Sequence, residues 1–378
     1  SNSATANGTP LIQFPNTAPP STGGPTYGGG GLDQGVDPNY RDPQSAQWNV
    51  TIERQLGSAT TVRASYVGMH SYRLNITEDL NQVHASTTPY NTGNNLVPYQ
   101  NWSTLYSTFN AGKQSYHAYE AEVTHHMAHG LSLDGSYTLA KNLADNQGDT
   151  PTSFAGEVNY GIPIADRFNV NSDYGNEEGT RRDRFLMTGK YQLPVGVGRT
   201  WLNHKGWLDQ LIGGWELTNI TLLETGPWLT PNISGTFDAS NTNVLNRGAS
   251  LRPDVASHNY YAGQSRANYF NPAAFVQTPA NAGRFGSAGV GILEGPGTEA
   301  VSLGLGKVFS VSERTKVRFE STFTNVLNHT NFAPPSSLQV IPNANGLNAN
   351  QAFGELSAAQ TAENAGNRTG QVALRLDF

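Results

Sequence analysis

A group of three histidines in the first half of the chain is the feature that most suggests a metal site. His125 and His126 are adjacent, and His117 lies upstream of them. Adjacent side chains of an extended strand point to opposite faces, so His125 and His126 cannot bind one ion together. The spacing supports no closed set of ligands, and the absence of cysteine removes thiolate sites. We therefore expect no metal and no cofactor.

Acidic side chains gather in two stretches between predicted strands. They are Asp145, Asp149, Asp173, Glu177 and Glu178, and the run Arg181-Arg182-Asp183-Arg184 follows directly. One interpretation is capture of a cation or a siderophore by hard oxygen ligands. The other is a solvated, salt-bridged loop that binds lipopolysaccharide through divalent ions. We favour the second interpretation, because the spacing lacks the fixed ligand order of a calcium loop.

No arrangement typical of a catalytic centre occurs in the sequence. We find no nucleophile elbow, no zincin pattern and no paired catalytic residues. The glycine run at 28–31 does not resemble a phosphate-binding loop, because no strand precedes it and no Lys-Ser/Thr pair follows it. We therefore predict that the protein is not an enzyme.

The composition argues against a nucleic-acid-binding protein and against a helical membrane protein. The 378 residues carry a net charge of -6, and charged residues make up 14%. The acidic balance argues against a nucleic-acid partner, which would need a basic stripe. No apolar run is long enough for a transmembrane helix, but a barrel strand exposes only every second residue to lipid. The start at Ser1 shows no charged or apolar leader region, so we expect a mature chain or, preferably, a fragment.

The last residues of the chain form an alternating strand that ends on an aromatic side chain. Val372, Leu374, Leu376 and Phe378 share one face, and polar residues occupy most of the other. A globular domain seldom ends inside a strand, whereas the final strand of an outer-membrane barrel must pair to close the sheet. We predict that Leu374, Leu376 and Phe378 form an assembly signal.

The same two-residue period recurs along the chain and predicts nine strands. They lie at 48–52, 62–66, 119–123, 131–139, 185–193, 214–229, 301–305, 317–323 and 370–378. Tight turns are expected at Gly57-Ser58 and His129-Gly130. In the stretch 214–229 apolar residues fall on both parities, which predicts a bulge.

The connections alternate between short and long, apart from the link at 194–210. In an outer-membrane barrel, short turns are periplasmic and long loops are extracellular. We therefore predict an all-β, antiparallel, up-and-down transmembrane barrel, with a Gly/Pro-rich loop at 1–43 and barrel strands and loops at 44–378. Complete bacterial barrels have even strand numbers, so nine strands indicate part of a larger barrel.

The parity of the strands predicts which side chains face the barrel interior. Arg318 and Glu320 share the polar face of their strand and are candidates to line the lumen or to contact a plug. A soluble β-sandwich would also show alternating apolar residues. Several predicted strands, however, reach the length that a tilted membrane crossing needs, which exceeds the usual length in soluble sheets.

Several stretches of the chain resemble the C-terminal half of the barrel of TonB-dependent receptors, in particular the Oar-like group of Acidobacteria. The most specific stretches are Tyr269-Phe-Asn-Pro-Ala-Ala-Phe275 and Asn325-Val-Leu-Asn-His-Thr-Asn-Phe332. Gln47–Leu56, Arg284–Gly289, Ile292–Gly297 and the terminal strand also match, in the order of the family. Together the matching stretches extend over most of residues 40–378.

The resemblance implies a larger barrel with an internal plug, energised by the TonB complex of the inner membrane. The expected location is the outer membrane of a Gram-negative-type cell. The expected partners are outer-membrane lipid, the plug and remaining strands of the same receptor, the TonB complex through those parts, and an unidentified ligand. Two alternatives remain open, a surface protein that serves adhesion or structure and a secreted β-protein that binds glycans. The loop at 231–298 is where we expect ligand recognition.

Overall fold

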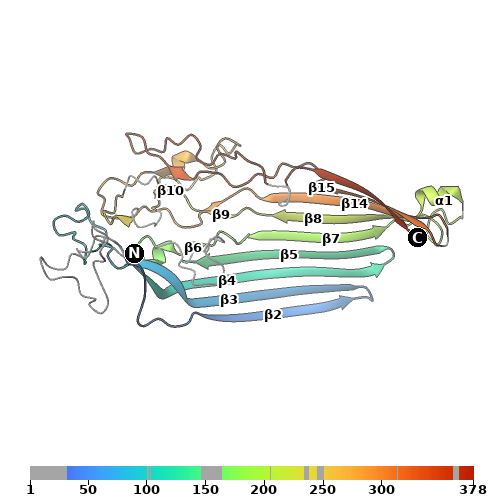
Figure 1. Cartoon of the computed structure of the whole chain (residues 1–378), viewed down its shortest axis with the longest axis horizontal. Helices are drawn as coiled ribbons and strands as arrows, with labels where there is room; N and C mark the ends of the chain where they lie inside the picture. The colour runs from blue at the N-terminus through green and yellow to red at the C-terminus, as the bar shows by residue number, and fades with distance from the viewer. Residues whose placement is uncertain are drawn as a thin grey trace, which may run out of the picture.

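The computed structural model describes residues 32–99, 102, 104–145, 164–204, 206–233, 238–244, 251–312, 314–360 and 366–378. One antiparallel sheet dominates the fold, and its strands lie side by side in chain order (Figure 1). In this order they are β2 (Gln44–Leu56), β3 (Thr60–Asp79), β4 (Leu105–Ala128), β5 (Leu131–Ala144), β7 (Asp183–Gln192), β8 (Trp215–Glu224), β14 (Thr298–Ser310), β15 (Lys316–Thr324) and β17 (Thr369–Asp377). We call this sheet the wall. It confirms the predicted up-and-down β architecture.

The two ends of the wall differ in the length of their connections. The links β2–β3, β4–β5 and β14–β15 are tight turns at the end that also holds the C-terminus, and the long connections gather at the opposite end (Figure 1). His129 and Gly130 have φ angles of 51° and 85°, as a two-residue hairpin turn of type I′ requires. The β7–β8 link, which holds helix α1 (Trp207–Ile212), lies at the short-turn end. The described residues include no helix that is long and apolar enough to span a membrane.

The register of strand pairing brings the apolar faces of all the wall strands to one side. Val50 lies opposite Tyr66, and Tyr66 lies opposite Tyr119. At the other edge of the wall, Leu303 lies opposite Phe323. Directly opposed residues of an antiparallel pair share a face, so the alternation in each strand adds up to one continuous apolar surface. We call it the apolar face, and the other side the polar face.

The apolar face is open rather than packed against a second layer. Ile52 is 71% exposed, and Leu374 and Val372 are 73% and 63% exposed. A soluble β-sandwich would bury such side chains between two sheets. The exposure therefore supports the membrane interpretation over the soluble one. In the described chain, β2 and β17 each have one neighbouring strand, so the wall is open at both edges.

Two sequence-based expectations about strands are wrong. The stretch 1–43, predicted to be loop, contains β1 (Leu32–Val36), which pairs in parallel with the part of β4 that extends beyond β5. Residues 1–31 lie outside the described residues. The stretch 214–229 has no bulge, because β8 pairs with β7 and β14 without a register shift and ends at Glu224. Ile220 and Leu222 instead occupy the polar face.

Short strands beyond the wall belong to the long connections. β9 (Trp228–Leu229) pairs with β13 (Leu293–Glu294), and β11 (Asp254–Val255) pairs with β12 (Phe275–Val276). β10 (Asn232–Ile233) pairs in parallel with β16 (Gln339–Val340), and β6 (Gly175–Asn176) pairs with β5. Two 3-10 turns, η1 (Val170–Asp173) and η3 (Pro272–Ala274), complete these elements.

Candidate functional site

The polar face of the wall carries paired charges. Arg63 of β3 forms an ion pair with Glu122 of β4, directly across the strand pair. Lys190 Nζ of β7 lies 2.7 Å from Glu216 Oε1 of β8. Such pairs suit a wet, partly screened environment, in which each contributes about 0–1 kcal/mol. The polar face can therefore line the interior of a barrel.

Arg318 and Glu320, the predicted lumen residues, both lie on the polar face of β15. Arg318 Nη1 is 3.7 Å from Glu320 Oε1, and the two side chains are 48% and 57% exposed. Their neighbours Val317 and Phe319 lie on the apolar face, opposite Leu376 and Leu374 of β17. The structure thus brings the two charges together, and their contact with a plug stays a prediction.

The residues of the proposed assembly signal lie at the edge and end of the wall. Leu374 and Leu376 are 73% and 57% exposed on the apolar face of β17, and Phe378 at the C-terminus is 96% exposed. β17 pairs with β15 along its whole length, from Thr369 to Asp377. Its other edge remains available for strand pairing, as an assembly role requires. The role itself stays a prediction.

The histidines take part in local hydrogen bonds. His125 Nδ1 is 2.7 Å from Thr60 Oγ1, and His117 Nδ1 is 2.7 Å from the Tyr66 hydroxyl. The His117 ring also stacks on the Tyr66 ring. Across the described residues, no three side chains of His, Asp or Glu are arranged to hold a metal ion.

The acidic residues near the outer ends of β5 and β7 bind separate partners. Asp145 Oδ1 accepts a hydrogen bond of 2.7 Å from the Lys113 backbone N–H, and burial raises the pKa of the Asp145 carboxyl. Asp173 forms an ion pair with Arg252. The Glu177 carboxylate accepts hydrogen bonds from residues of its own turn. Asp149 lies outside the described residues. These contacts match a salt-bridged loop better than a shared cation site.

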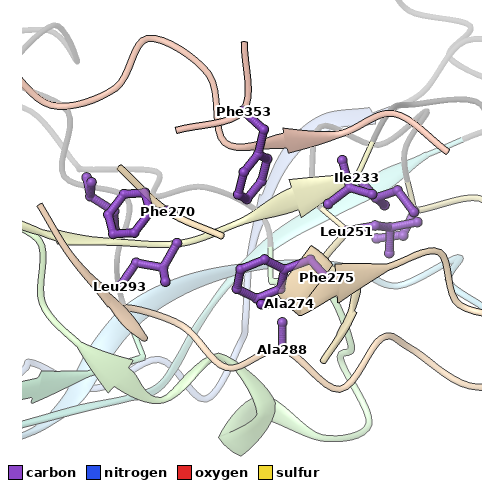
Figure 2. Close-up of a cluster of buried hydrophobic side chains, with 11 residues drawn as sticks. Ile233, Leu251, Phe270, Ala274, Phe275, Ala288, Leu293 and Phe353 are labelled. Carbon is purple, nitrogen blue, oxygen red and sulfur yellow. The ribbon is translucent and has the colours of Figure 1, made fainter. Parts of the chain in front are cut away.

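The long connections build a second structural unit at the end of the wall opposite the short turns, which we call the cap. It comprises the described parts of residues 80–104, 145–182, 225–297 and 325–368. Phe270, Phe275, Phe353 and Leu293 are fully buried in one cluster, and Figure 2 shows their side chains converging from separate segments. The rings of Tyr260 and Phe275 stack with centroids 5.5 Å apart. The cap therefore has a hydrophobic core of its own.

The two stretches that resemble the receptor family most specifically are structural parts of this cap. In the first, Phe270 and Phe275 enter the core, and Asn271 Oδ1 accepts the Ala273 N–H to cap η3. In the second, Asn331 is 1% exposed; its Oδ1 accepts the Glu299 N–H at 2.8 Å and its Nδ2 donates to the Glu299 carbonyl at 3.0 Å. The Asn331 side chain thus bonds the 325–368 connection to β14.

A buried ion pair joins two of the cap connections. Arg252 Nη1 donates to Asp173 Oδ1 at 2.6 Å, and the two side chains are 10% and 12% exposed. Arg252 also donates to the carbonyls of Ser172 and Ala288, at 2.9 and 2.8 Å. Each guanidinium nitrogen thus donates one hydrogen bond, which compensates for the burial of the cation.

A second ion pair stabilises a turn inside the cap. The Arg284 guanidinium donates two hydrogen bonds of 2.7 Å to the Asp254 carboxylate. Burial alone would raise the pKa of Asp254, but the hydrogen bonds from Arg284 and the Ser287 N–H together lower it. Gly286 lies between these residues, and a Cβ there would come within 2.0 Å of the Arg252 carbonyl oxygen. The glycine is therefore required by close packing.

Further hydrogen bonds connect the 80–104 connection to the 225–297 connection. The Ser86 N–H donates to the Ser240 carbonyl at 3.0 Å, and Asn95 Nδ2 donates to the Asn241 carbonyl at 3.1 Å. Ser240 is 1% exposed. Within the loop predicted at 231–298, Ser240 is thus buried between two connections rather than exposed. The sequence signal for this packed segment was the run of small polar residues after Asp238. In the structure the Asp238 carboxylate accepts backbone N–H groups of this run and so forms tight turns.

A sheet with one apolar face, a paired-charge polar face and strands in chain order has the geometry of a transmembrane barrel wall. The family model described as "Outer membrane beta barrel domain" matches residues 1–371. The chain belongs to this family. In an outer membrane β-barrel domain the apolar face meets lipid and the polar face lines the interior. The chain is therefore an outer membrane protein of the Gram-negative type, as the sequence predicted.

Several solved outer membrane proteins have a similar fold. They include the outer membrane transporter YddB from Escherichia coli (9% identity, TM-score 0.43) and the FrpB iron transporter from Neisseria meningitidis (10%, 0.37). BauA, the ferric preacinetobactin receptor from Acinetobacter baumannii, is a third (12%, 0.35). The matches cover 90%, 91% and 88% of this chain but 33%, 32% and 29% of those chains. The chain thus spans about a third of their length. A comparison with curated proteins gives no match.

Proposed function

We propose that the chain forms part of the wall and the outer cap of a TonB-dependent receptor of the Oar-like group, which takes up an unidentified ligand. The sequence stretches that resemble this group support the proposal, because they build the cap core and attach it to the wall. We assign residues 44–378 to the barrel with its outer connections and residues 1–43 to a Gly/Pro-rich loop that includes β1. We propose a binding and transport role rather than an enzymatic one.

The observation that carries the proposal is the packing of the outer connections into a single body. Three links join them: the Arg252–Asp173 ion pair, the Asn95–Asn241 hydrogen bond and the parallel pairing of β10 with β16. Independent mobile loops would not need a shared core. A rigid cap above a barrel can hold recognition residues at fixed positions over the lumen entrance, which is what selective uptake requires.

The polar face supports a filled lumen. Ile220 and Leu222 of β8 lie on this face, and Leu222 is opposite Leu186 of β7 and Ala300 of β14. Apolar side chains of this kind stabilise the protein when they are buried against other protein atoms, but not when they face a water-filled channel. We infer that a plug from the rest of the receptor packs here and that Arg318 and Glu320 contact its polar surface. The TonB complex would act through that plug. We propose no nucleic-acid partner.

Deletion of the complete receptor gene in the source bacterium tests the transport role. Spent medium from the parent and the deletion strain is compared by mass spectrometry, with a TonB-deficient strain as the matched control. Transport predicts a solute that the parent depletes and both variants leave behind. Adhesion predicts a different result, in which the deletion reduces attachment to surfaces while solute depletion is unchanged. That second result would overturn the transport proposal.

A further inference from the structure

Helix α1, in the connection between β7 and β8, exposes an apolar arc to its surroundings. Trp207 is 72% exposed and Leu211 is 60% exposed, while Leu208 and Ile212 are 42% and 44% exposed. The spacing of these four residues places them on one side of the helix. A helix on a soluble surface has the opposite arrangement, with its apolar side packed inward.

The polar side of α1 is the side that packs against the protein. Asp209 Oδ1 accepts the Val197 N–H at 2.8 Å. A Cβ at Gly213 would lie 2.4 Å from the same oxygen, and one at Gly196 would lie 2.7 Å from it. Gly196 also has a φ of 120°, which favours glycine. These contacts hold the Asp209 side chain against the 196–197 and 213 backbone. The apolar arc, on the other side of the helix, therefore faces away from the protein.

The position of α1 relative to the wall is set by Trp215, the first residue of β8. The Trp215 indole N–H donates to the Leu211 carbonyl at 3.0 Å. Trp215 pairs with Lys307 of β14, so it lies on the apolar face, and its ring contacts the rings of Phe309 and Phe319 there. The apolar arc of α1 is therefore continuous with the lipid-facing surface of the barrel.

Lys307 lies near the end of β14, directly across from Trp215. Its side chain arises from the apolar face but is only 5% exposed, and its Nζ lies 4.8 Å from the Phe309 ring and 5.4 Å from the Trp215 ring. The Lys307 ammonium is therefore covered by aromatic rings close to the point where α1 meets the apolar face.

We propose that α1, together with Trp201, is an interfacial anchor that inserts its apolar arc into the phospholipid leaflet at the short-turn end of the barrel. Trp201 is 64% exposed on the same connection. This end is periplasmic by the rule that short turns face the periplasm. Aromatic and aliphatic side chains on one side of a short helix suit the boundary between headgroups and acyl chains.

The position of α1 within the sheet disfavours other occupants of its apolar arc. β8 lies inside the wall, with β14, β15 and β17 on one side and β7, β5, β4, β3 and β2 on the other. Strands that continue the barrel join at β2 and β17, so they do not reach α1. A plug lies in the lumen, which is on the opposite side of the sheet from Trp215. Lipid is the partner that this surface already meets.

A spin-label experiment tests the proposal. The 378 residues contain no cysteine, and any cysteine elsewhere in the complete receptor is first replaced by serine. Single cysteines replace Leu211 in the apolar arc, Gln210 next to it, Leu374 on the lipid-facing wall and Ser58 in a short turn. Each is introduced into the complete receptor, labelled with a nitroxide and reconstituted in phospholipid vesicles; only heat-modifiable, folded protein is measured. Collision rates with oxygen, which concentrates in lipid, are compared with those of a water-soluble nickel chelate.

The proposal predicts that the label at Leu211→Cys resembles the label at Leu374→Cys, with oxygen favoured severalfold over nickel. Labels at Gln210→Cys and Ser58→Cys should favour nickel. A Leu211→Cys label that behaves like the Ser58→Cys label would place α1 in water and overturn the proposal. A label shielded from both reagents would indicate a protein partner and overturn it as well.

A second measurement keeps the test decisive if Leu211→Cys does not fold. The native Trp207 is left in place, and fluorescence is quenched by brominated phospholipid. The difference between the parent and Trp207→Phe isolates the emission of Trp207. Quenching of that difference signal by brominated lipid is expected, and its absence would overturn the proposal.

Discussion

Leu303→Arg places a positive charge on the apolar face near the middle of β14. Leu303 lies opposite Phe323 on one side and Asn219 on the other, and it is 39% exposed in a face that meets lipid. Ser302 is the adjacent residue of the same strand and lies on the polar face. The pair Leu303→Arg and Ser302→Arg therefore introduces the same charge at the same depth on opposite sides of the wall.

The expected difference in stability follows from the two environments. Arginine on the lipid face near the bilayer midplane costs about 2–4 kcal/mol. This corresponds to a loss of roughly 30- to 1,000-fold in the ratio of folded to unfolded protein. Arginine at Ser302 stays out of lipid on the polar face, opposite Ile220. We therefore expect a smaller cost there, about 0.5–1 kcal/mol.

Equilibrium refolding of the complete receptor into phospholipid vesicles measures this difference. The folded fraction is read from heat-modifiable mobility on a gel across a series of urea concentrations. Leu303→Arg should move the midpoint to lower urea, while Ser302→Arg should stay close to the parent. Equal destabilisation by the two variants would show that the assignment of lipid and lumen faces to β14 is wrong.

Three further predictions concern topology, assembly and the cap. A peptide tag inserted after Asn345, in an exposed turn of the cap, should be reached by antibody on intact cells, while a tag after Ser58 should not; antibody binding at Ser58 would reverse the orientation. Deletion of Phe378 from the complete protein should leave it degraded in the periplasm, while the detergent-refolded protein keeps nearly the parent stability. Normal outer-membrane levels would leave Phe378 only a local packing role of about 1–2 kcal/mol. Arg252→Met leaves a buried carboxylate at Asp173 without its cation and should cost about 3–5 kcal/mol of cap stability, measured as faster limited proteolysis. Adding Asp173→Asn should recover part of that loss, and a double variant as labile as the single one would contradict the ion-pair explanation.

The tag position illustrates where sequence reasoning was insufficient. Ser240 and Asn345 both lie in long connections rich in small polar residues, so their local sequences predict the same exposed loop. In the structure Ser240 is 1% exposed, because its hydroxyl and backbone bond to neighbouring turns and to the 80–104 connection. Asn345 lies in an exposed turn. Only contacts between residues distant in the chain distinguish the two sites.

The strands of the wall were predictable because their signal is local. Each strand alternates apolar and polar residues within about ten positions, and this period alone indicates the two faces. β8 was the exception. Ile220 and Leu222 lie on its polar face, so its apolar residues fall on both parities, and this pattern wrongly predicted a bulge. Their position reflects the interior of the barrel, which no local pattern encodes.

The sequence by itself determined the barrel class, the order of the wall strands, their faces and the outer membrane location. The physical reason is that lipid forces every strand into the same two-residue alternation, so each strand carries its own evidence. The tertiary structure decided the cap and the outward direction of the apolar side of α1. The cap core draws Phe270, Leu293 and Phe353 from segments with no shared period, and α1 is directed by the contacts of Asp209 with Gly196 and Gly213. Both depend on long-range packing, which arises only when separate segments meet.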